Sequence, residues 1–449
     1  MGRSNLSTRG PLPSPSVRVD ETSLTGFAGA IPLIRFLNNV IELPQRLFHV
    51  VNYDGRKRKY GIHLVLFAFV VGALIGVERL AHLEFLRGDA VLLKFLRLPA
   101  WPVRKVFANA VGSLSDQAVS GLQELLTSIG LWSLSDPNGV IIDFDSSAIV
   151  SFGQQEGAVF GYCGKGRNRR RHHPLVASVA ATRVVVNAKY RDGSAIDALE
   201  SISFFGETVA RIRSRFSGCL PTIRADSGFW SNPMGKWLLE GHLPFVMSFP
   251  LGASLKLMLH CAAWKTLEDD PDIELATLKG EDLKLDPRLN VVVIRRFVHD
   301  PKAPPQGKVV ETDPNWRYQA LVTSMDWEPL DVWRFYNDRG DCERVFKVGK
   351  HALGMGCLIS LNFRANTVAF LLRMLAFNVD LLFQRHTEER ARELNRPTVK
   401  IGLQARQRQF YQGVARLLKY QDGWVLRVQE SRFIKPLWNF YAEDLLSTS

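Results

Sequence analysis

The chain has 449 residues, enough for two or three domains with at least one large hydrophobic core. Its formal net charge of +13 favours a polyanionic partner, nucleic acid first and an anionic membrane surface second, but does not separate an enzyme from a packaging protein. The five cysteines are scattered without a C-x-x-C pair, which argues against a zinc site and a disulfide framework.

The N-terminal third reads as a polar tail followed by helices. Residues 1–26 are polar and proline-containing, which predicts a disordered tail, and 27–135 read as an all-helical domain. The uncharged run 60–77 reaches the lower edge of membrane-spanning length. It contains His63, Gly72 and Gly76 and continues without a break into the amphipathic stretch 78–87. These features favour a buried helix and no stable membrane association over a membrane anchor.

The pattern changes to alternating strands and helices over 136–251. The apolar run 139–145 predicts a strand that ends on two carboxylates, Asp143 and Asp145, and a loop with a cluster of basic residues follows it. The expected elements after this loop are strands at 173–182 and 183–190, a helix at 194–217, a strand at 220–226, a helix at 231–241 and a strand at 243–249. This order predicts an α/β sheet whose acidic residues lie where strands stop, the usual place for chemistry in such sheets.

The last part of the chain interrupts this scheme and then returns to it. Strand-like pieces separated by Pro- and Asp-rich loops predict an inserted β subdomain at 252–330. Residues 331–388 then read as the second part of the sheet domain, with a long apolar helix. Residues 389–449 form a basic C-terminal region.

Four chemically distinct side chains recur at helical spacing in 336–350. Tyr336, Arg339, Glu343 and Lys350 fall within an arc of about 60° if the segment is one helix. The Glu343 carboxylate can hold a divalent cation there, and the Arg339 and Lys350 side chains can neutralise phosphate oxygens. The alternative is a solvated helix face with an Arg339–Glu343 ion pair, and Gly340 weakens the helix itself.

Three carboxylates are candidates for a shared metal site: Asp145 and Asp226 at strand ends, and Glu343 on the later helix. Converging in a basic cleft, they could hold a pair of Mg²⁺ ions for in-line phosphoryl transfer, because Mg²⁺ prefers oxygen ligands. The alternative is that each aspartate only caps the next turn.

Several motifs carry a family resemblance. Tyr336-x2-Arg339-x3-Glu343-x6-Lys350 resembles the Y-R-E-K signature of DDE transposases from bacterial insertion sequences. Further matches to one branch of that group are Gly76-Val77-Glu78-Arg79-Leu80, Gln155-Glu156-Gly157-Ala158, His172-His173-Pro174-Leu175 and Arg224-Ala225-Asp226-Ser227-Gly228-Phe229. The resemblance covers roughly 60–380.

The resemblance implies a ribonuclease-H-like core with a β insertion before the third acidic residue. It implies that Asp145, Asp226 and Glu343 bind Mg²⁺, with Mn²⁺ as a substitute, and catalyse strand cleavage and transfer. The residues that would contact DNA are Tyr336, Arg339, Lys350, Arg169, Arg170 and Arg171.

Further expectations follow from the same resemblance. The helical domain 27–135 would bind DNA, and the partners would be the terminal inverted repeats and target DNA. The protein would form a homodimer in the synaptic complex and would lie in the bacterial cytoplasm, associated with the nucleoid. Asp145 is preferred as the first acid because Ser146 and Ser147 follow it. Asp143 stays open as a competitor for this first position or as a supporting neighbour, since strand alternation puts both aspartates on one face.

Two other questions stay open on the sequence. A transposase-derived protein that binds DNA but has lost catalysis is the alternative function, although all three acidic positions are filled. His172 and His173 are interpreted as structural residues, because a metal-binding histidine needs a clustered second ligand.

Overall fold

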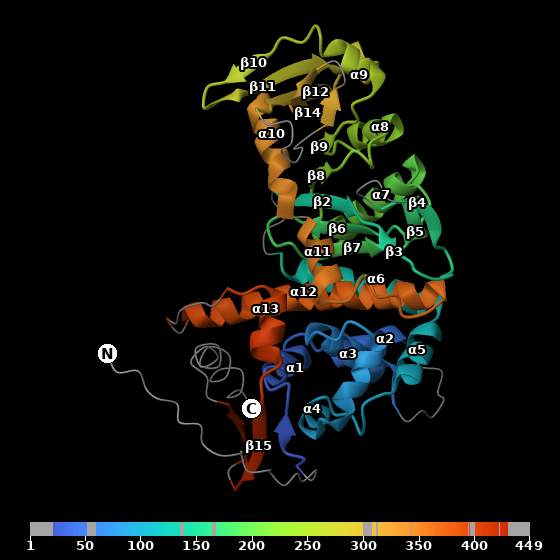
Figure 1. Ribbon diagram of the computed structural model, residues 1–449, viewed down its shortest axis with the longest axis vertical. Helices are drawn as coiled ribbons and strands as arrows, with labels where there is room; N and C mark the ends of the chain where they lie inside the picture. The colour runs from blue at the N-terminus through green and yellow to red at the C-terminus, as the bar shows by residue number, and fades with distance from the viewer. Residues whose placement is uncertain are drawn as a thin grey trace, which may run out of the picture.

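The computed structural model describes residues 21–51, 60–134, 139–163, 168–299, 308–310, 313–341, 343–393, 395, 400–421 and 423–429. Figure 1 shows three tiers: a strand-rich insertion at the top, a sheet with flanking helices in the middle, and a helical tier below. The long helix α12, Phe363–Glu393, runs between the middle and lower tiers. The predicted α/β architecture with a helical N-terminal region is confirmed.

The strands of the middle and upper tiers form one mixed sheet. Its order is β10-β11-β12-β14-β9-β8-β2-β6-β7, and β13 pairs with β14. The strands are β2 (Ile141–Ser146), β6 (Leu175–Val179), β7 (Val185–Lys189), β8 (Thr222–Ala225), β9 (Phe245–Ser248), β10 (Lys265–Leu267), β11 (Asp270–Lys279), β12 (Asn290–Phe297), β13 (Lys308–Val310) and β14 (Asp313–Thr323).

The core half of this sheet has the ribonuclease-H-like arrangement that the resemblance implies. Strand β2 pairs antiparallel with β6 and parallel with β8, β6 continues antiparallel to β7, and β8 is parallel to β9. Helices α6 (Asp116–Trp132) and α12 share a hydrophobic cluster with one face of this sheet, and α7 (Ala198–Arg215) and α8 (Asn232–Glu240) share a cluster with the other. Both faces are therefore covered, and chemistry is confined to the strand ends.

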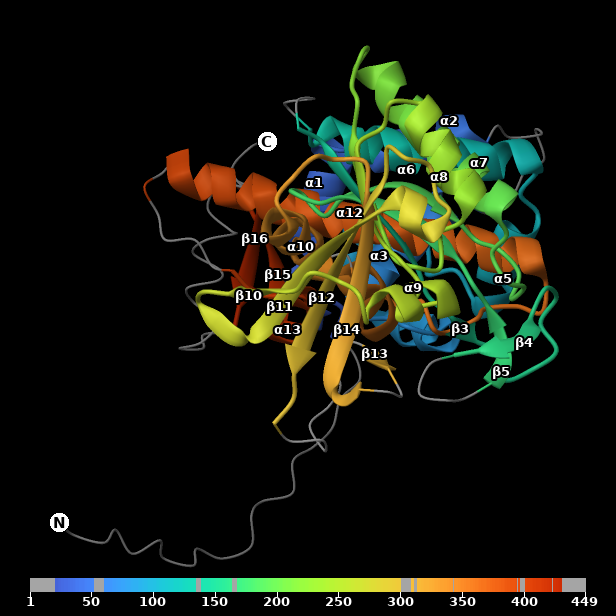
Figure 2. The same cartoon turned by 90° about the horizontal axis from the view of Figure 1, so that it is seen from above.

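The insertion is built of strands, as predicted, but it does not form a sheet of its own. Strand β14 pairs antiparallel with β9, so β10 to β14 extend the core sheet sideways. Helices α9 (Ala253–Met258) and α10 (Pro329–Asn337) flank this extension, and α10 packs on β11, β12 and β14. Figure 2 shows these long strands projecting past the helices of the core. Helix α10 thus brings the chain from the insertion back to the core.

The lower tier consists of α1 (Ala30–Asn39), α2 (Leu43–Val51), α3 (Ile62–Leu74), η1 (Leu80–Gly88), α4 (Ala90–Phe95) and α5 (Arg104–Gly112). Helix α3 is buried along most of its length, as predicted. The predicted unbroken continuation of this helix into 78–87 was wrong. Gly76 has a φ of +96°, a left-handed conformation that glycine adopts at no steric cost. The chain turns there before η1 begins.

The helical tier does not have a core of its own. Side chains of α1 to α6 share one hydrophobic cluster with α12, with α11 (Glu343–Ala352) and with Phe410 and Tyr411 of the single π-turn Gln407–Tyr411 that follows α13 (Leu403–Arg406). Within the described residues, α12 is the one helix long and apolar enough to cross a membrane, and 89% of its most apolar window is buried in this cluster. The boundary predicted at 135 stays a prediction.

Two small sheets include segments that were predicted to be a disordered tail and a loop. Leu24–Thr25 forms β1, which pairs with β15 (Ala415–Tyr420) and through it with β16 (Gly423–Val428). The predicted disordered tail therefore does not reach residue 26, and residues 1–20 lie outside the described part. The predicted basic loop instead contains β3 (Ile149–Val150), β4 (Val159–Tyr162) and β5 (Asn168–His172), paired in the order β3-β5-β4.

Candidate active site

The first two candidate carboxylates lie at the ends of neighbouring parallel strands. Phe144 of β2 is in register with Ala225 of β8, so Asp145 and Asp226 each follow a paired residue. Parallel strands lie about 4.8 Å apart, which places the two aspartates side by side. The amide of Ser146 donates to Asp145 Oδ1 at 2.9 Å, and that of Gly228 donates to Asp226 Oδ1 at 2.9 Å. The sheet register alone thus brings together residues 81 positions apart.

Tyr336, on the last turn of α10, is close enough to both carboxylates for their charges to act on its hydroxyl. Burial raises the pKa of its hydroxyl, the positive charge of Arg339 opposes this rise, and the negative charges of Asp226 and Asp145 add to it. A hydrogen bond between Tyr336 and Ser248, at the end of β9, holds the ring in place. The phenol therefore lies at the same edge of the sheet as the two carboxylates.

Arg339 brings a cation directly onto the first carboxylate. It lies on η3 (Asp338–Asp341), and its side chain is about one-tenth exposed. Its Nη2 donates to the carbonyl oxygen of Phe144 at 2.8 Å and to Asp145 Oδ1 at 3.3 Å. These contacts orient Asp145 from the side of the returning chain.

Asp143 has a different set of contacts, two residues earlier on β2. Arg224 Nε and Nη2 donate to its two carboxylate oxygens at 2.7 and 2.9 Å, and both side chains are almost fully buried. Arg224 Nη1 also donates to the carbonyl oxygen of Phe335 at 2.6 Å. The pair ties β2, β8 and α10 together. Asp143 therefore supports the site and does not open onto it.

The chain matches a known protein family over most of its length. The model of the transposase DDE domain group 1 family matches residues 14–403. The chain belongs to this family. None of the curated protein sequences compared with the chain matches it.

Two solved structures of transposases resemble the fold. One is the piggyBac transposase synaptic complex with hairpin DNA, with a TM-score of 0.44, 12% identity and coverage of 85% of this chain and 79% of that one. The other is the Drosophila P element transposase strand transfer complex, with a TM-score of 0.24, 11% identity and coverage of 52% and 51%.

The third candidate carboxylate of this DDE-family chain, Glu343, lies in the sequence between Arg339, which contacts Asp145, and Lys350, which contacts Ser147. Tyr336, Arg339 and Glu343 were expected on one continuous helix, and this expectation was wrong. Helix α10 ends at Asn337, η3 follows, and Glu343 is the first residue of α11. Gly340 lies in the break, where its low helix propensity favours the tighter turn. The Glu343 side chain lies outside what the structure describes.

The donor set is suited to a hard divalent cation. Asp145 and Asp226 supply adjacent carboxylate oxygens, the ligands that Mg²⁺ prefers, and no sulfur is needed. Among the side chains that the structure describes, no three His, Cys, Asp or Glu gather as a metal site. The two aspartates therefore fit such an ion as part of its set of oxygen ligands.

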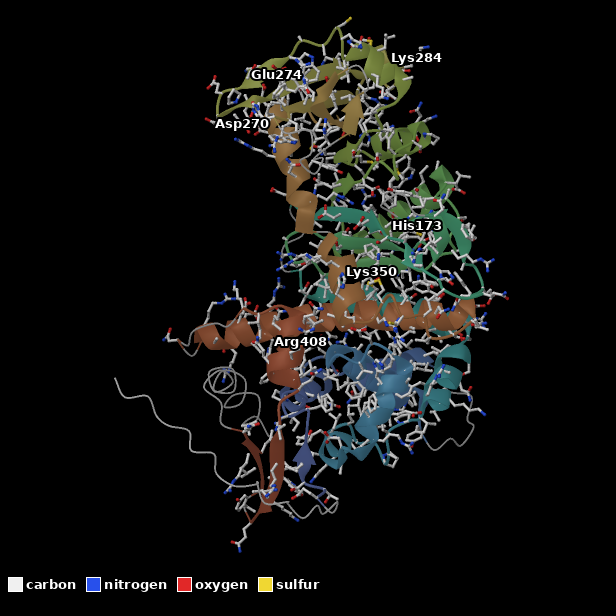
Figure 3. The ribbon with its side chains drawn as sticks, in the orientation of Figure 1. His173, Asp270, Glu274, Lys284, Lys350 and Arg408 are labelled. Atoms are coloured by element: carbon white, nitrogen blue, oxygen red, sulfur yellow. The ribbon has the colours of Figure 1, made fainter. Side chains whose placement is uncertain are left out.

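Lys350, on α11, lies at the connection between β2 and β3 (Figure 3). Its Nζ donates to Ser147 Oγ at 2.6 Å and to the carbonyl oxygen of Ala148 at 2.9 Å. Burial lowers the pKa of its ammonium, and the negative charge of Asp145 opposes this. Two of the three donors of this ammonium thus fix the chain immediately after Asp145; its predicted DNA contact stays a prediction.

The basic cluster and the two histidines lie beside this connection. Arg169 and Arg170 are exposed on β5, whereas Arg171 Nη1 donates to the carbonyl oxygen of Tyr162. His172 is fully buried with Nε2 2.9 Å from the carbonyl oxygen of Glu156, and burial and nearby cations lower the pKa of His173 to about 4. The contacts of His172 are those of a structural residue.

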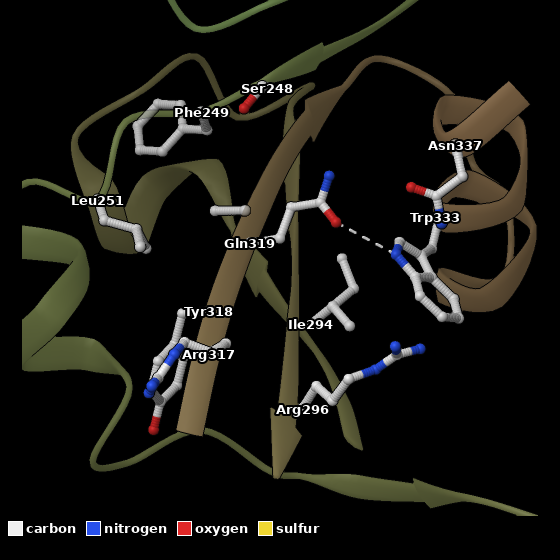
Figure 4. A pocket seen from close by; sticks show the side chains of 11 residues that line it. Ser248, Phe249, Leu251, Ile294, Arg296, Arg317, Tyr318, Gln319, Trp333 and Asn337 are labelled. Carbon is white, nitrogen blue, oxygen red and sulfur yellow. Dashed lines mark hydrogen bonds between the residues drawn. The ribbon is translucent and has the colours of Figure 1, made fainter. Parts of the chain in front are cut away.

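Sequence reasoning missed a cleft that borders the site. It has a volume of about 610 Å³ and lies between the inserted strands and α10 (Figure 4). Trp333 Nε1 donates to Gln319 Oε1 at 3.2 Å across it, and Ser248, the partner of Tyr336, lies at its rim. Because these residues come from distant segments, no local sequence signal could have grouped them.

Proposed function

We propose that the chain is an active DNA transposase that cleaves and transfers strands at the ends of a bacterial insertion sequence. The observation that carries this proposal is the adjacency of Asp145 and Asp226 at the ends of parallel strands, facing Tyr336 and Arg339. Family membership supports phosphoryl transfer as the reaction class. A basic net charge of +13 supports a nucleic-acid substrate.

The chain's own residues would bind and orient the reacting groups. Asp145, Asp226 and Glu343 would hold Mg²⁺, or Mn²⁺ in its place, as oxygen ligands. When bound, such ions activate a water or a 3′-hydroxyl and stabilise the leaving oxygen of an in-line displacement. Arg339 would keep the Asp145 carboxylate oriented through its contact at 3.3 Å.

The DNA itself would be held by cations near the acidic edge. Arg339 lies on η3 and contacts Asp145, and the exposed Arg169 and Arg170 lie on β5, which pairs with the strand that follows Asp145. Phosphate oxygens would approach these cations. Tyr336 would contact the backbone of the transposon end. We further propose a homodimer in the synaptic complex, acting on terminal inverted repeats and target DNA in the nucleoid.

The test uses labelled duplexes taken from the genomic DNA on both sides of the reading frame, where short inverted repeats mark the ends of an element. Wild-type protein with Mg²⁺ or Mn²⁺ is expected to nick these duplexes at the repeat. Asp226→Asn and Glu343→Gln should lower cleavage by about a thousandfold or more while binding remains, because each removes a ligand oxygen charge.

The matched control is Asp331→Asn, an exposed carboxylate near the start of α10. It should cleave as wild type does. Full cleavage by either acidic-site variant would remove the mechanism. If wild-type protein bound the repeats but never nicked them with either metal, the chain would instead be a DNA-binding protein derived from a transposase.

A further inference from the structure

The small sheet β3-β5-β4 and its connections, residues 149–163 and 168–172, form what we call the arm. It carries three aromatic side chains that face solvent: Phe152, Phe160 and Tyr162, with exposed fractions of 86%, 70% and 60%. Exposed aromatic groups gathered on one small element mark an interaction surface, because leaving them in water is unfavourable.

The arm is also strongly basic. Arg170 pairs with Phe160 across the two strands, so both side chains lie on one face of the arm. Arg169 projects from the other face, and its guanidinium lies 5.8 Å from the centre of the Phe152 ring. Glu156 is the single acidic residue of 149–172. Its carboxylate accepts the amide of Phe363 at 2.9 Å, at the start of α12, where the helix dipole stabilises its charge.

A pocket of about 400 Å³ lies between the arm and the helical tier. Phe152, Val150 and Gln155 line it from the arm, Arg79 and Arg104 from the helical tier, and residues 356–359 from the chain before α12. Both of these arginines are exposed. An aromatic ring beside two guanidinium groups is the combination that takes a base and its phosphate.

The turn that carries Phe152 is held by several hydrogen bonds. The amide of Ser151 donates to the carbonyl oxygen of Arg170 at 2.8 Å, and the hydroxyl of Ser151 donates to the side chain of Gln155. The amide of Glu156 donates to the carbonyl oxygen of Leu361 at 2.9 Å. The turn that carries the ring is thus held in place before any ligand arrives, which lowers the entropic cost of binding.

The arm begins directly beyond the acidic edge. Asp145 is in register with Val176, and Ile149 of β3 is in register with His172, so the antiparallel pairing resumes four residues after Asp145. Lys350 fixes the connection in between through Ser147 and Ala148. DNA held at Asp145 would pass onto the arm.

We propose that the arm and its pocket bind unpaired nucleotides of single-stranded DNA beside the cleavage site, with bases stacked on Phe152 and Phe160. This inference rests on the proposed function for its biological setting, but not for its chemistry. Bases in a duplex present only their edges, whereas unpaired bases offer the faces that exposed rings can stack on. The arginines supply the phosphate contacts.

The experiment measures binding of fluorescein-labelled oligothymidylate and of a mixed-sequence duplex of equal length by fluorescence anisotropy, in EDTA. Phe152→Ala and Phe160→Ala should each raise the Kd for oligothymidylate about five- to a hundredfold, the range that loss of one stacked base gives. The Kd for the duplex should change less than about twofold. Both side chains are exposed, so the variants should fold.

The matched control is Phe85→Ala, an equally exposed phenylalanine on η1 that does not line the pocket. It should bind both probes as wild type does. Wild-type affinity of both arm variants for oligothymidylate would overturn the proposal, and so would an equal loss on both probes, which would mark a general DNA surface. Because no metal is present, a failure of cleavage has no bearing on this result.

Discussion

Strand β2 carries two aspartates on one face, and their surroundings differ sharply. Asp143, in the strand interior, is held by two charge-assisted hydrogen bonds from Arg224, and both side chains are about 3% exposed or less. Asp145, at the strand end, meets Arg339 at 3.3 Å, and both side chains are about one-tenth exposed. One residue type on one strand thus has two different environments.

The difference follows from dielectric and geometry. A buried carboxylate is tolerated only when a cation with matching hydrogen bonds compensates its lost hydration, which the planar guanidinium of Arg224 does. The longer contact at Asp145 leaves that carboxylate nearer to water and beside Asp226. The interior pair therefore stabilises the joint between β2, β8 and α10, while the end position remains open to a ligand.

The difference between the two aspartates is tested most directly by removing each carboxylate in turn. Asp143→Ala should lower the free energy of unfolding by about 3–5 kcal/mol, because it leaves the buried Arg224 charge uncompensated. Asp145→Asn should lower it by less, about 1–2 kcal/mol, because the amide oxygen of asparagine can still accept from the nine-tenths-buried Arg339, which also keeps its hydrogen bond to the Phe144 carbonyl. Urea unfolding measured by fluorescence gives both values.

A second pair of variants separates a lost charge from a lost contact. Asp143→Leu combined with Arg224→Met should recover most of the stability, because replacing both members of a buried ion pair by apolar groups is often neutral. Equal destabilisation by Asp143→Ala and Asp145→Asn would show that the two aspartates do not differ as their contacts indicate.

Lys350 extends the comparison beyond the end of β2. Lys350→Met removes the hydrogen bonds to Ser147 and Ala148 and should lower the free energy of unfolding by about 1.5–3 kcal/mol. If its main role is to fix this connection, the slope of log K against log salt for DNA binding should not change.

Arg170→Ala is the matched variant for the salt measurement, because Arg170 is exposed and fixes no connection. A residue that contacts one phosphate contributes about 0.9 to that slope in duplex DNA, and we expect this loss for Arg170→Ala. A similar loss in Lys350→Met with unchanged stability would make Lys350 a DNA contact and not an anchor.

The sequence was sufficient for features that local pattern determines. Apolar runs that stop at Asp145 and Asp226 predicted strands with acidic ends, and alternating strand-like pieces predicted the insertion. Neighbouring parallel strands then bring the two acids together by register alone. The apolar run that became α3 was recognised as buried for the same local reason.

The features that sequence reasoning missed depend on distant residues. Nothing local to Asp143 indicates Arg224 as its partner, and nothing near Tyr336 indicates Ser248. The predicted continuous helix is interrupted by η3, which contains Gly340, a residue of low helix propensity. The arm was read as a loop because β3 spans two residues and pairs with a strand of arginines.

The smallest expected effect concerns His173, which lies near several cations beyond the end of β2. Burial first, and then the positive charges of Arg171, Arg191 and Lys350, lower the pKa of His173 from 6.5 to about 4, against the opposing Glu200. His173 therefore binds a proton near pH 6.5 in the unfolded chain, but only near pH 4 in the folded chain. Stability from this group is fully present above pH 6.5 and is lost as the pH falls toward 4.

His173→Gln should flatten the pH dependence of unfolding in this window, by about 1–2 kcal/mol in total once solvent screening of a partly exposed group is allowed for. His260→Gln, an exposed histidine in the insertion, should leave the wild-type profile unchanged. Carboxylates titrate alike in all three proteins, so the difference between the curves isolates His173. A wild-type slope in His173→Gln would mean that the cations around this edge act more weakly on their neighbours than their positions indicate. The contrast between the interior and the end of β2 would then rest on Asp143 alone.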